Sequence, residues 1–310
     1  MKLKTALFLS ALFLITQLIF FIRYKSDHNL QIQFIDVGQG DSVLITTPNK
    51  QLVLVDGGPE TNNNLESVIA SKFYFTQCNI NTIVATHPHK DHIKGLSKVL
   101  DMCNVKNIFL TKDYYESLDY LDFLQKVKAE KSNVKYVETS DKFIIDNVTF
   151  TVLWPDYGIL TSDENLECTA LQTCTTPTCT NIKIYNLLPN PPVNCANPNY
   201  VSIVLKMSYK NFDTLLTGDA EDPILEKLKI TNKVEILKTP HHGAYDSLDT
   251  NLINKLNPLI AIVSVGKNNV YHHPSPKVLG AFSNRKIKTL VTKDTGTISI
   301  KSDGERFWIK

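Results

Sequence analysis

The 310-residue sequence has little excess of positive over negative charge, since its formal net charge is only +2. It lacks the strong positive field that drives non-specific binding to nucleic acid. A basic tilt over residues 277–301 is interpreted as a solvated surface, with a track for a polyanion as the alternative. Aromatic residues (9%) and charged residues (21%) are near ordinary usage, which excludes a disordered, collagen-like or coiled-coil class. The 43% hydrophobic content suffices for one large domain or two ordinary ones.

The N-terminal segment lacks both a cleavage site and a lipid-attachment site. An uncharged apolar stretch from Thr5 to Ile22 is flanked on each side by Lys or Arg, and no A-x-A-like pattern or nearby cysteine follows it. As a helix it would be about 27 Å long, near the lower limit for spanning a bilayer. The sequence therefore favours an uncleaved membrane anchor through residues 5–22 over a cleaved signal, within a segment of residues 1–28. The rest of the chain is then expected outside the cytoplasm, either membrane-anchored or secreted.

The six cysteines form no C-x2-C pair, which disfavours a structural zinc cluster. Four of them lie in one segment rich in Thr, Asn and Pro: Cys168, Cys174, Cys179 and Cys195. The other two, Cys78 and Cys103, lie on either side of the histidine motif described below. An even count favours disulfides in an oxidising compartment, with free thiols as the alternative.

Short apolar runs alternate with helical patterns along residues 29–310, which we expect to form one domain. Strands are expected over residues 31–38, 42–48, 51–58, 80–87, 107–111, 134–138, 148–155, 200–209, 212–219, 234–240, 260–266, 288–294 and 296–302. Helices are expected over residues 65–75, 93–102 and 115–131, from residue 223 and after residue 247. The pattern predicts a mixed α/β fold with two sheets packed face to face and helices outside. The cysteine-bearing stretch at about 158–199 interrupts it as a long polar insertion without regular structure, typical of a lid or a decoration.

The strongest motif for chemistry is HPHKDH, which follows one expected strand and precedes a helix. Pro88 biases His87 towards an extended backbone, so the imidazoles of His87 and His89 point the same way and can bind one metal ion. Asp91 and His92 are displaced towards the helix and can serve a second ion. Imidazole with carboxylate suits Zn²⁺, and less selectively Mn²⁺ or Fe²⁺. The alternative is a helix cap at Asp91 with surface histidines.

Other polar residues lie where apolar strands end. Asp56 follows LVLV, Asp219 follows TLLTG, and His241 and His242 follow EILKTP. Each alone is explained by ordinary turn chemistry. Their convergence with the HPHKDH loop at strand ends predicts a site built at a sheet edge.

The order DGG, HPHKDH, LLTGD and PHHG resembles the metallo-β-lactamase superfamily. FIDVGQGDSVLI, PHHGAYDS, SVGKNNVYHHPSP and TKDTGTISIKSDGERFWI are similar, more narrowly, to the hydrolase domain of ComEC-type competence (DNA-uptake) proteins. The similarity runs from about residue 31 to residue 310, interrupted by the cysteine-bearing insertion. It implies a four-layered αββα sandwich that holds two divalent metal ions, Zn²⁺ or Mn²⁺.

The resemblance also implies a role for each motif residue. His87 and His89 match ligands of the first metal, and Asp91 and His92 match ligands of the second. The remaining matches are Asp219 as the bridging carboxylate, His241 or His242 as the last ligand, and Asp56 as an acid that orients the site. The superfamily supplies a further histidine to the first metal, but residues 197–202 contain none. The first ion is therefore expected to be weak or completed by water, so that one or two ions are held tightly.

Three further expectations concern single residues. Asp91 is expected to accept a proton from the bridging water as well as bind metal. His273, in YHHPSP, matches a ComEC-like histidine and is expected to act as a donor to a substrate phosphate or as a general acid; a surface turn is the alternative. Asp41, in DVGQGD, lies in a tight turn and is expected to support the site, although turn formation alone also explains it.

Three functions remain open at this point. The first is a phosphodiesterase or nuclease that uses a metal-bound hydroxide on a nucleic-acid strand. The second is a hydrolase of another ester or amide, such as a phosphocholine ester or a lactam. The third is a non-catalytic nucleic-acid-binding module.

Overall fold

The computed structural model describes residues 8–18, 28–60, 63–73, 76–174, 179–230, 232–248 and 250–310. Residues 8–18 are helical, and the remainder of the expected apolar segment 5–22 lies outside the described residues. Among the described residues, no helix combines the length and the apolar character that a bilayer span requires. The role of residues 5–22 as an anchor or signal therefore stays a prediction.

The first large sheet has eight strands in the order β17-β16-β1-β2-β3-β4-β5-β6. Their bounds are β1 (Leu30–Phe34), β2 (Val43–Thr46), β3 (Leu52–Val55), β4 (Asn79–Val84), β5 (Asn104–Leu110), β6 (Asn133–Tyr136), β16 (Ile298–Ser302) and β17 (Phe307–Ile309). Strands β1 to β3 form an antiparallel meander, and β3 to β6 run parallel. Strand β16 pairs with β1, so the end of the chain completes the sheet that its beginning starts.

The second large sheet has seven strands in the order β15-β14-β13-β12-β11-β8-β7. Their bounds are β7 (Lys142–Ile145), β8 (Val148–Trp154), β11 (Val204–Tyr209), β12 (Phe212–Leu216), β13 (Ile236–Lys238), β14 (Ile260–Val263) and β15 (Lys288–Val291). Strands β12 to β15 are parallel. Each sheet therefore contributes parallel strands whose carboxyl ends can carry polar residues.

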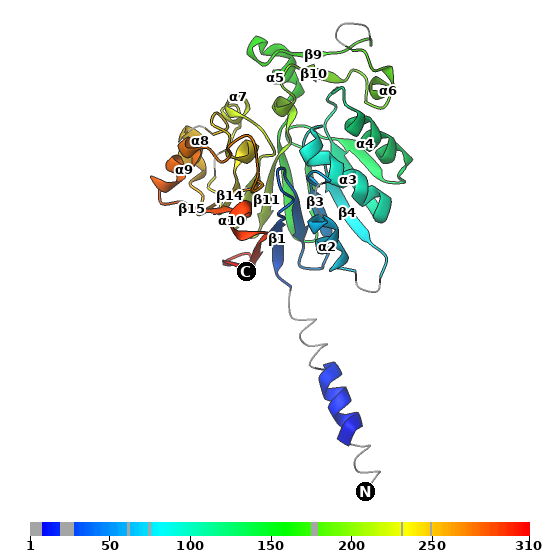
Figure 1. Cartoon of the computed structure of the whole chain (residues 1–310), viewed down its shortest axis with the longest axis vertical. Coiled ribbons are helices and arrows are strands. Elements are labelled where there is room, and N and C mark those ends of the chain that lie inside the picture. The colour runs from blue at the N-terminus through cyan, green and yellow to red at the C-terminus, as the bar shows by residue number, and fades with distance from the viewer. Residues whose placement is uncertain are drawn as a thin grey trace.

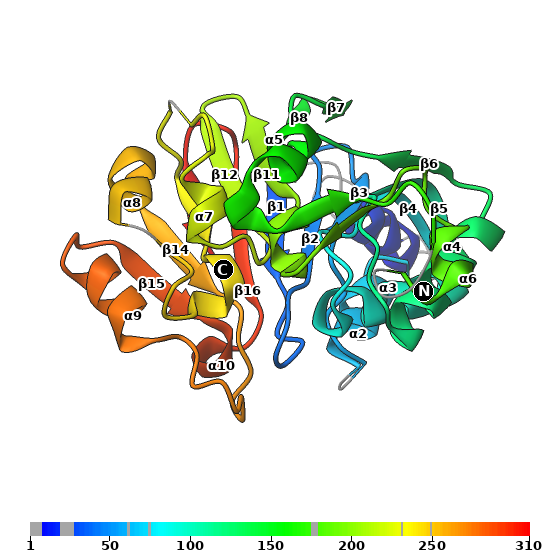
Figure 2. The same cartoon turned by 90° about the horizontal axis from the view of Figure 1, so that it is seen from above.

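The two sheets face each other, and helices cover the outer face of each (Figures 1 and 2). Helices α2 (Asn64–Ala70), α3 (Lys90–Met102) and α4 (Leu118–Ala129) pack on the first sheet. Helices α7 (Asp222–Leu225), α8 (Thr250–Leu256) and α9 (Pro276–Ser283) pack on the second. Strands β2 and β3 are buried along their whole length, because one face meets the helices and the other meets the second sheet. The predicted four-layered αββα sandwich is confirmed.

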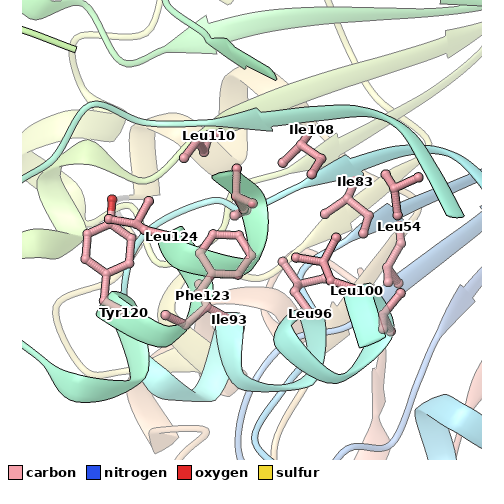
Figure 3. Packing of buried hydrophobic residues seen from close by; sticks show 14 of the residues in the cluster. Leu54, Ile83, Ile93, Leu96, Leu100, Ile108, Leu110, Tyr120, Phe123 and Leu124 are labelled. Carbon is pink, nitrogen blue, oxygen red and sulfur yellow. The ribbon is translucent and has the colours of Figure 1, made fainter. Parts of the chain in front are cut away.

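Three buried layers hold this arrangement together. One lies between the first sheet and its helices, where Leu96 of α3 and Phe123 of α4 point at Ile83 and Ile108 of the sheet (Figure 3). A second lies between the two sheets, and the third lies between the second sheet and its helices. Burying such large side chains contributes roughly 1.5–3 kcal/mol each relative to exposure. These layers make a rigid base for the strand ends.

The cysteine-bearing stretch contains regular structure, so the expectation of a long irregular insertion is wrong. Its elements are α5 (Tyr157–Ser162), η1 (Glu164–Leu166), β9 (Cys168–Ala170), α6 (Ile182–Tyr185), β10 (Val193–Cys195) and η2 (Pro198–Val201). They gather at one end of the sandwich (Figure 1). Local patterns failed here because β9 and β10 are three residues each and form a sheet with one another, with a single bridge from Val193 of β10 to Asp113. The predicted disulfides are confirmed: Cys78–Cys103, Cys168–Cys195 and Cys174–Cys179.

Candidate metal centre

The predicted ligands come from the carboxyl ends of parallel strands in both sheets. Asp56 follows β3, and His87 and His89 follow β4. Helix α3 begins at Lys90, three residues before the expected start, so Asp91 and His92 lie in its first turn. From the second sheet, Asp219 follows β12, and His241 and His242 lie in η3 (Pro240–Gly243) after β13. The two parallel halves thus meet at one site.

One carboxylate oxygen, Asp219 Oδ2, lies at the centre of this site. The Nε2 atoms of His92 and His242 lie 3.2 and 3.3 Å from it. The Nε2 atoms of His241 and His87 lie 3.9 and 4.0 Å from it. Four imidazoles from two sheets therefore converge on a single oxygen, as a bridging ligand requires.

The most compact group is Asp91, His92, Asp219 and His242, whose ligand atoms all lie within 4.8 Å of one another. Asp91 Oδ2 lies 3.5 Å from His242 Nε2 and 4.0 Å from His92 Nε2. Both Nε2 atoms are buried and have no well-formed hydrogen bond within the described ranges. Two carboxylates with two open imidazole nitrogens fit a divalent transition-metal ion. The residues expected to hold the second ion therefore lie together, and their role as ligands stays a prediction.

The first pair, His87 and His89, is also in contact, with His87 Nε2 3.1 Å from His89 Nδ1. No group of three or more ligand atoms as compact as the one above forms around this pair among the described residues. Residues 197–202, which lack the superfamily's histidine, contact the site in another way. Ser202 Oγ accepts a hydrogen bond from the backbone N–H of Asp219 (3.2 Å). Burial lowers the pKa of both His87 and His89, which keeps their nitrogens unprotonated and available to a metal.

Asp56 holds the imidazole of His92. The carboxylate of Asp56 is fully buried. It accepts hydrogen bonds from the backbone N–H (2.8 Å) and the hydroxyl (2.7 Å) of Thr86, and it lies 2.8 Å from His92 Nδ1. Burial raises the pKa of Asp56, against the opposing charge of His92. A carboxylate on Nδ1 leaves Nε2 for a metal, which is the usual support of a metal-bound histidine. The orienting role predicted for Asp56 fits this geometry.

Asp41 lies beside His242, whose Nδ1 is hydrogen-bonded to the carbonyl of Ser264 (2.9 Å). Asp41 also contacts Lys238, a buried residue that no sequence motif indicated. Asp41 Oδ1 lies 3.5 Å from His242 Nδ1, and its other oxygen contacts the ammonium of Lys238. Lys238 is buried at the end of β13, 1% exposed, and donates to the carbonyl of Gly218 (2.9 Å). Burial would lower the pKa of Lys238, but the charges of Asp41 and Asp219 outweigh it and raise the pKa. A lysine at the end of an apolar strand directly before PHH is the signal that could have revealed it.

The site attracts positive charge. Burial would lower the pKa of His242, but the charges of Asp219 and Asp41 raise it to about 10. The pKa of His92 is likewise raised, by Asp219 and Asp56, against burial. For Asp91, burial would raise the pKa, but the imidazoles of His242 and His92 lower it to about 2. The same two imidazoles hold the pKa of Asp219 well below its usual range, so both metal-facing carboxylates are ionised at neutral pH.

A hollow of about 380 Å³ opens over the metal-facing side chains. Its lining residues are Gln39, His89, Lys90, Asp91, Tyr115, Asp219, His241, His242, Tyr271 and His273. The His273 ring lies 5.9 Å from the His241 ring and stacks on Tyr271 at 5.8 Å. Burial lowers the pKa of His273, and the nearby charges of His241 and His242 lower it further. His273 thus faces the site from beyond the ligand groups, while Tyr115 and Tyr271 are lining residues that sequence motifs did not reveal.

Residues 35–168 match the family model described as the metallo-beta-lactamase superfamily. This part of the chain is therefore similar in sequence to the superfamily that the motifs indicated. In solved structures, it resembles the metallo-beta-lactamase fold protein YhfI from Bacillus subtilis, with a TM-score of 0.52 and 11% identity, covering 88% of this chain and 100% of that one. This likeness concerns the fold alone.

Two curated relatives are close to the ComEC type that the motifs indicated. The chain is 26% identical over 291 residues to ComE operon protein 3 of Bacillus subtilis (strain 168), covering 87% of this chain and 33% of that protein. It is 28% identical over 125 residues to Recombination protein 2 of Haemophilus influenzae (strain ATCC 51907 / DSM 11121 / KW20 / Rd), covering 40% of this chain and 16% of that protein. The chain therefore spans a third or less of the length of these relatives. With its ligand set, it has the fold and the candidate divalent-metal site of the metal-dependent hydrolases of this superfamily.

Proposed function

We propose that this protein is a metal-dependent phosphodiesterase that cleaves nucleic-acid strands. The observation that carries the proposal is the convergence of four imidazole Nε2 atoms on Asp219 Oδ2, with Asp91 beside them. Similarity to ComE operon protein 3 and Recombination protein 2 supports a nucleic-acid substrate. Divalent ions bound here would lower the pKa of water and stabilise negative charge on a phosphoryl group.

The chain's own residues have distinct tasks in this proposal. Asp219 presents Oδ2 to the ions, and Asp56 keeps Nε2 of His92 pointed at them. The side chain of Asp91 is one-third exposed, so it reaches both the ligand cluster and the hollow and can accept a proton from water there. His273 lies across the same hollow with a lowered pKa and so presents a neutral imidazole N–H to a phosphate oxygen.

The decisive experiment compares wild type with Asp219→Asn, using the purified full-length chain with added Mn²⁺ or Zn²⁺. We expect wild type to hydrolyse bis(p-nitrophenyl) phosphate and to cleave a single-stranded oligonucleotide, and Asp219→Asn to lose at least about 10²-fold in kcat, the scale for one transition-state-stabilising group. Asp213→Asn is the matched control, because Asp213 lies on β12, the strand that leads to Asp219, and pairs with Lys206 away from the site.

The outcomes separate the competing functions. Equal inertness of wild type and Asp219→Asn would remove the enzyme claim. Turnover of the small diester without any strand cleavage, or of a lactam instead, would remove the nucleic-acid claim and favour another ester or amide as substrate. Binding of the strand that weakens steeply with salt would support a polyanionic substrate.

We further propose that the domain works outside the cytoplasm, anchored through residues 5–22 or secreted. All six cysteines are paired in disulfides, which supports an oxidising compartment. Protease accessibility of the domain in intact cells tests the location, and membrane fractionation tests the anchor.

A further inference from the structure

The four imidazoles around Asp219 Oδ2 divide into two pairs. His92 and His242 also face Asp91, and together they form the compact group. His87 instead contacts His89, and these two residues are the pair expected to bind the first metal ion. His241 is the remaining imidazole, and its Nε2 lies 3.9 Å from Asp219 Oδ2, nearly the same distance as His87 Nε2 at 4.0 Å.

The other nitrogen of His241 faces a carboxylate. Its Nδ1 lies 3.0 Å from Glu221 Oε1, which leaves Nε2 directed at Asp219. His92 likewise has a carboxylate at Nδ1 and Asp219 at Nε2, and there the contact with Asp56 is a well-formed hydrogen bond, whereas His241 and Glu221 are related by proximity. A carboxylate behind a histidine is the recurrent support of a metal ligand, because it fixes the tautomer and raises the basicity of the outer nitrogen.

The backbone of η3 explains how two consecutive histidines serve one oxygen. His241 has φ 42° and ψ 49°, and His242 has φ 54° and ψ 16°, both left-handed values that non-glycine residues rarely adopt. Such strain in consecutive residues persists where the surroundings hold it and is concentrated at functional sites. The backbone N–H of His241 donates to the carbonyl of Gly218 (3.3 Å), which ties this turn to the strand end that carries Asp219.

Glu221 is itself held by the stretch that lacks a histidine. Asn199 Nδ2 donates to Glu221 Oε1 (2.9 Å), and Asn197 Nδ2 donates to Glu221 Oε2 (2.8 Å). Residues 197–202 therefore contact the site through Glu221, held by Asn197 and Asn199, and through the backbone of Asp219, held by Ser202.

From this geometry we infer that His241, backed by Glu221, is the third imidazole ligand of the first metal ion. It takes the place of the histidine that the superfamily carries at residues 197–202, and Asn197 and Asn199 hold the backing carboxylate. His242 then belongs to the second ion alone. The inference rests on the proposed metal centre, but it concerns binding and does not depend on the reaction.

Metal binding tests it directly. The full-length chain is stripped with chelator and titrated with Mn²⁺ or Zn²⁺ by calorimetry, and bound metal is counted by elemental analysis. We expect two ions in wild type, one in His241→Ala, and one in His242→Ala. Glu221→Gln keeps its size and is expected to weaken one of the two ions by 10- to 100-fold, the effect typical of a lost outer-shell carboxylate.

Three measurements exclude a merely structural effect. His28→Ala removes an exposed histidine far from the site in sequence and is expected to bind two ions as wild type does. Co²⁺ absorption spectra are expected to differ between His241→Ala and His242→Ala, because each variant leaves a different ion in place. Circular dichroism of the metal-free variants confirms that each is folded.

The inference is overturned if His241→Ala binds metal with the stoichiometry and affinities of wild type. It is also overturned if the spectra show that His241→Ala and His242→Ala lose the same ion. Failure of the proposed function gives a different result: two ions bind and His241→Ala loses one, yet wild type turns over no phosphodiester.

Discussion

Lys238 Nζ lies 3.7 Å from Asp219 Oδ1, while the imidazole Nε2 atoms gather at the other oxygen of that carboxylate. The ammonium and the metal-facing nitrogens therefore use different oxygens of one side chain. Lys238 also contacts Asp41, so a buried positive charge offsets two of the carboxylates beneath the site. The lysine holds Asp219 in place without competing for the oxygen that faces the ions.

Replacing Lys238 with methionine should strongly destabilise the metal-free protein. The change leaves Asp41 buried without its partner, and removing one member of a buried pair costs about 3–5 kcal/mol. The double variant Lys238→Met/Asp41→Asn should recover part of that loss, since the orphaned charge is gone. Urea unfolding in the presence of chelator measures both. The control is Lys206→Met, which breaks a partly exposed pair with Asp213 and should cost only about 0–1 kcal/mol; a similar cost for Lys238→Met would contradict the prediction.

The candidate ligands could be predicted from the sequence because each lies in a short motif directly after an apolar strand. Both the motif and the strand can be recognised within a few consecutive residues. The sequence did not reveal Lys238, because lysine is almost never fully buried unless paired and its partner Asp41 is nearly two hundred positions away. Glu221 was missed for the same reason, since its contacts come from η2 and η3 rather than from its own segment. The layered fold follows from alternating strand and helix patterns. The short elements of the insertion could not be predicted, because they are held by strand pairing and disulfides, and neither produces a hydrophobic periodicity in the sequence.

Chelation should lower the stability of the folded protein. Bound metal would be held by the carboxylates of Asp91 and Asp219 together with the imidazoles of His92 and His242, a set that only the folded state brings together, so chelation removes a ligand that binds the folded state alone. A free metal-ion concentration of about 100 times the dissociation constant should add roughly 2.7 kcal/mol to the free energy of unfolding. Thermal unfolding with chelator, and again after Mn²⁺ or Zn²⁺ is restored, measures this difference. In Asp219→Asn the restored metal should give a much smaller shift; an equal shift would mean that the ion binds elsewhere.

Asp113 should make stability depend on pH in an unusual direction. Its carboxyl is buried near the bridge to Val193 of the insertion, and no side chain in the described part of the chain hydrogen-bonds to it. Burial raises its pKa well above the usual value, so the folded state holds the proton more tightly than the unfolded state does. The resulting penalty is absent below the unfolded pKa of about 3.9 and grows as pH rises towards the folded pKa.

Asp113→Asn should remove that penalty. The variant should match wild type near pH 4 and become more stable than wild type by about 1 kcal/mol or more at higher pH, the scale of an unsatisfied buried polar group. Urea unfolding at several pH values measures the difference, in which the titration of all other groups cancels. Asp122→Asn, at an exposed position on α4, should show no such trend. A constant or falling difference between Asp113→Asn and wild type would refute the burial argument.

His273 should affect turnover without affecting metal content. Its ring faces the hollow and lies beside the rings of Tyr271 and His241, and among the described residues it is not part of the compact group of Asp91, His92, Asp219 and His242. His273→Ala should therefore retain two bound ions and lose about 10²-fold in kcat on a phosphodiester, the lower range for a positioned acid or donor. His273→Gln separates the two roles left open by the sequence: its amide keeps an N–H donor, so partial recovery of kcat indicates donation to the phosphate, whereas no recovery indicates proton transfer. Wild-type turnover in both variants would show that His273 is a surface turn residue with no part in the reaction.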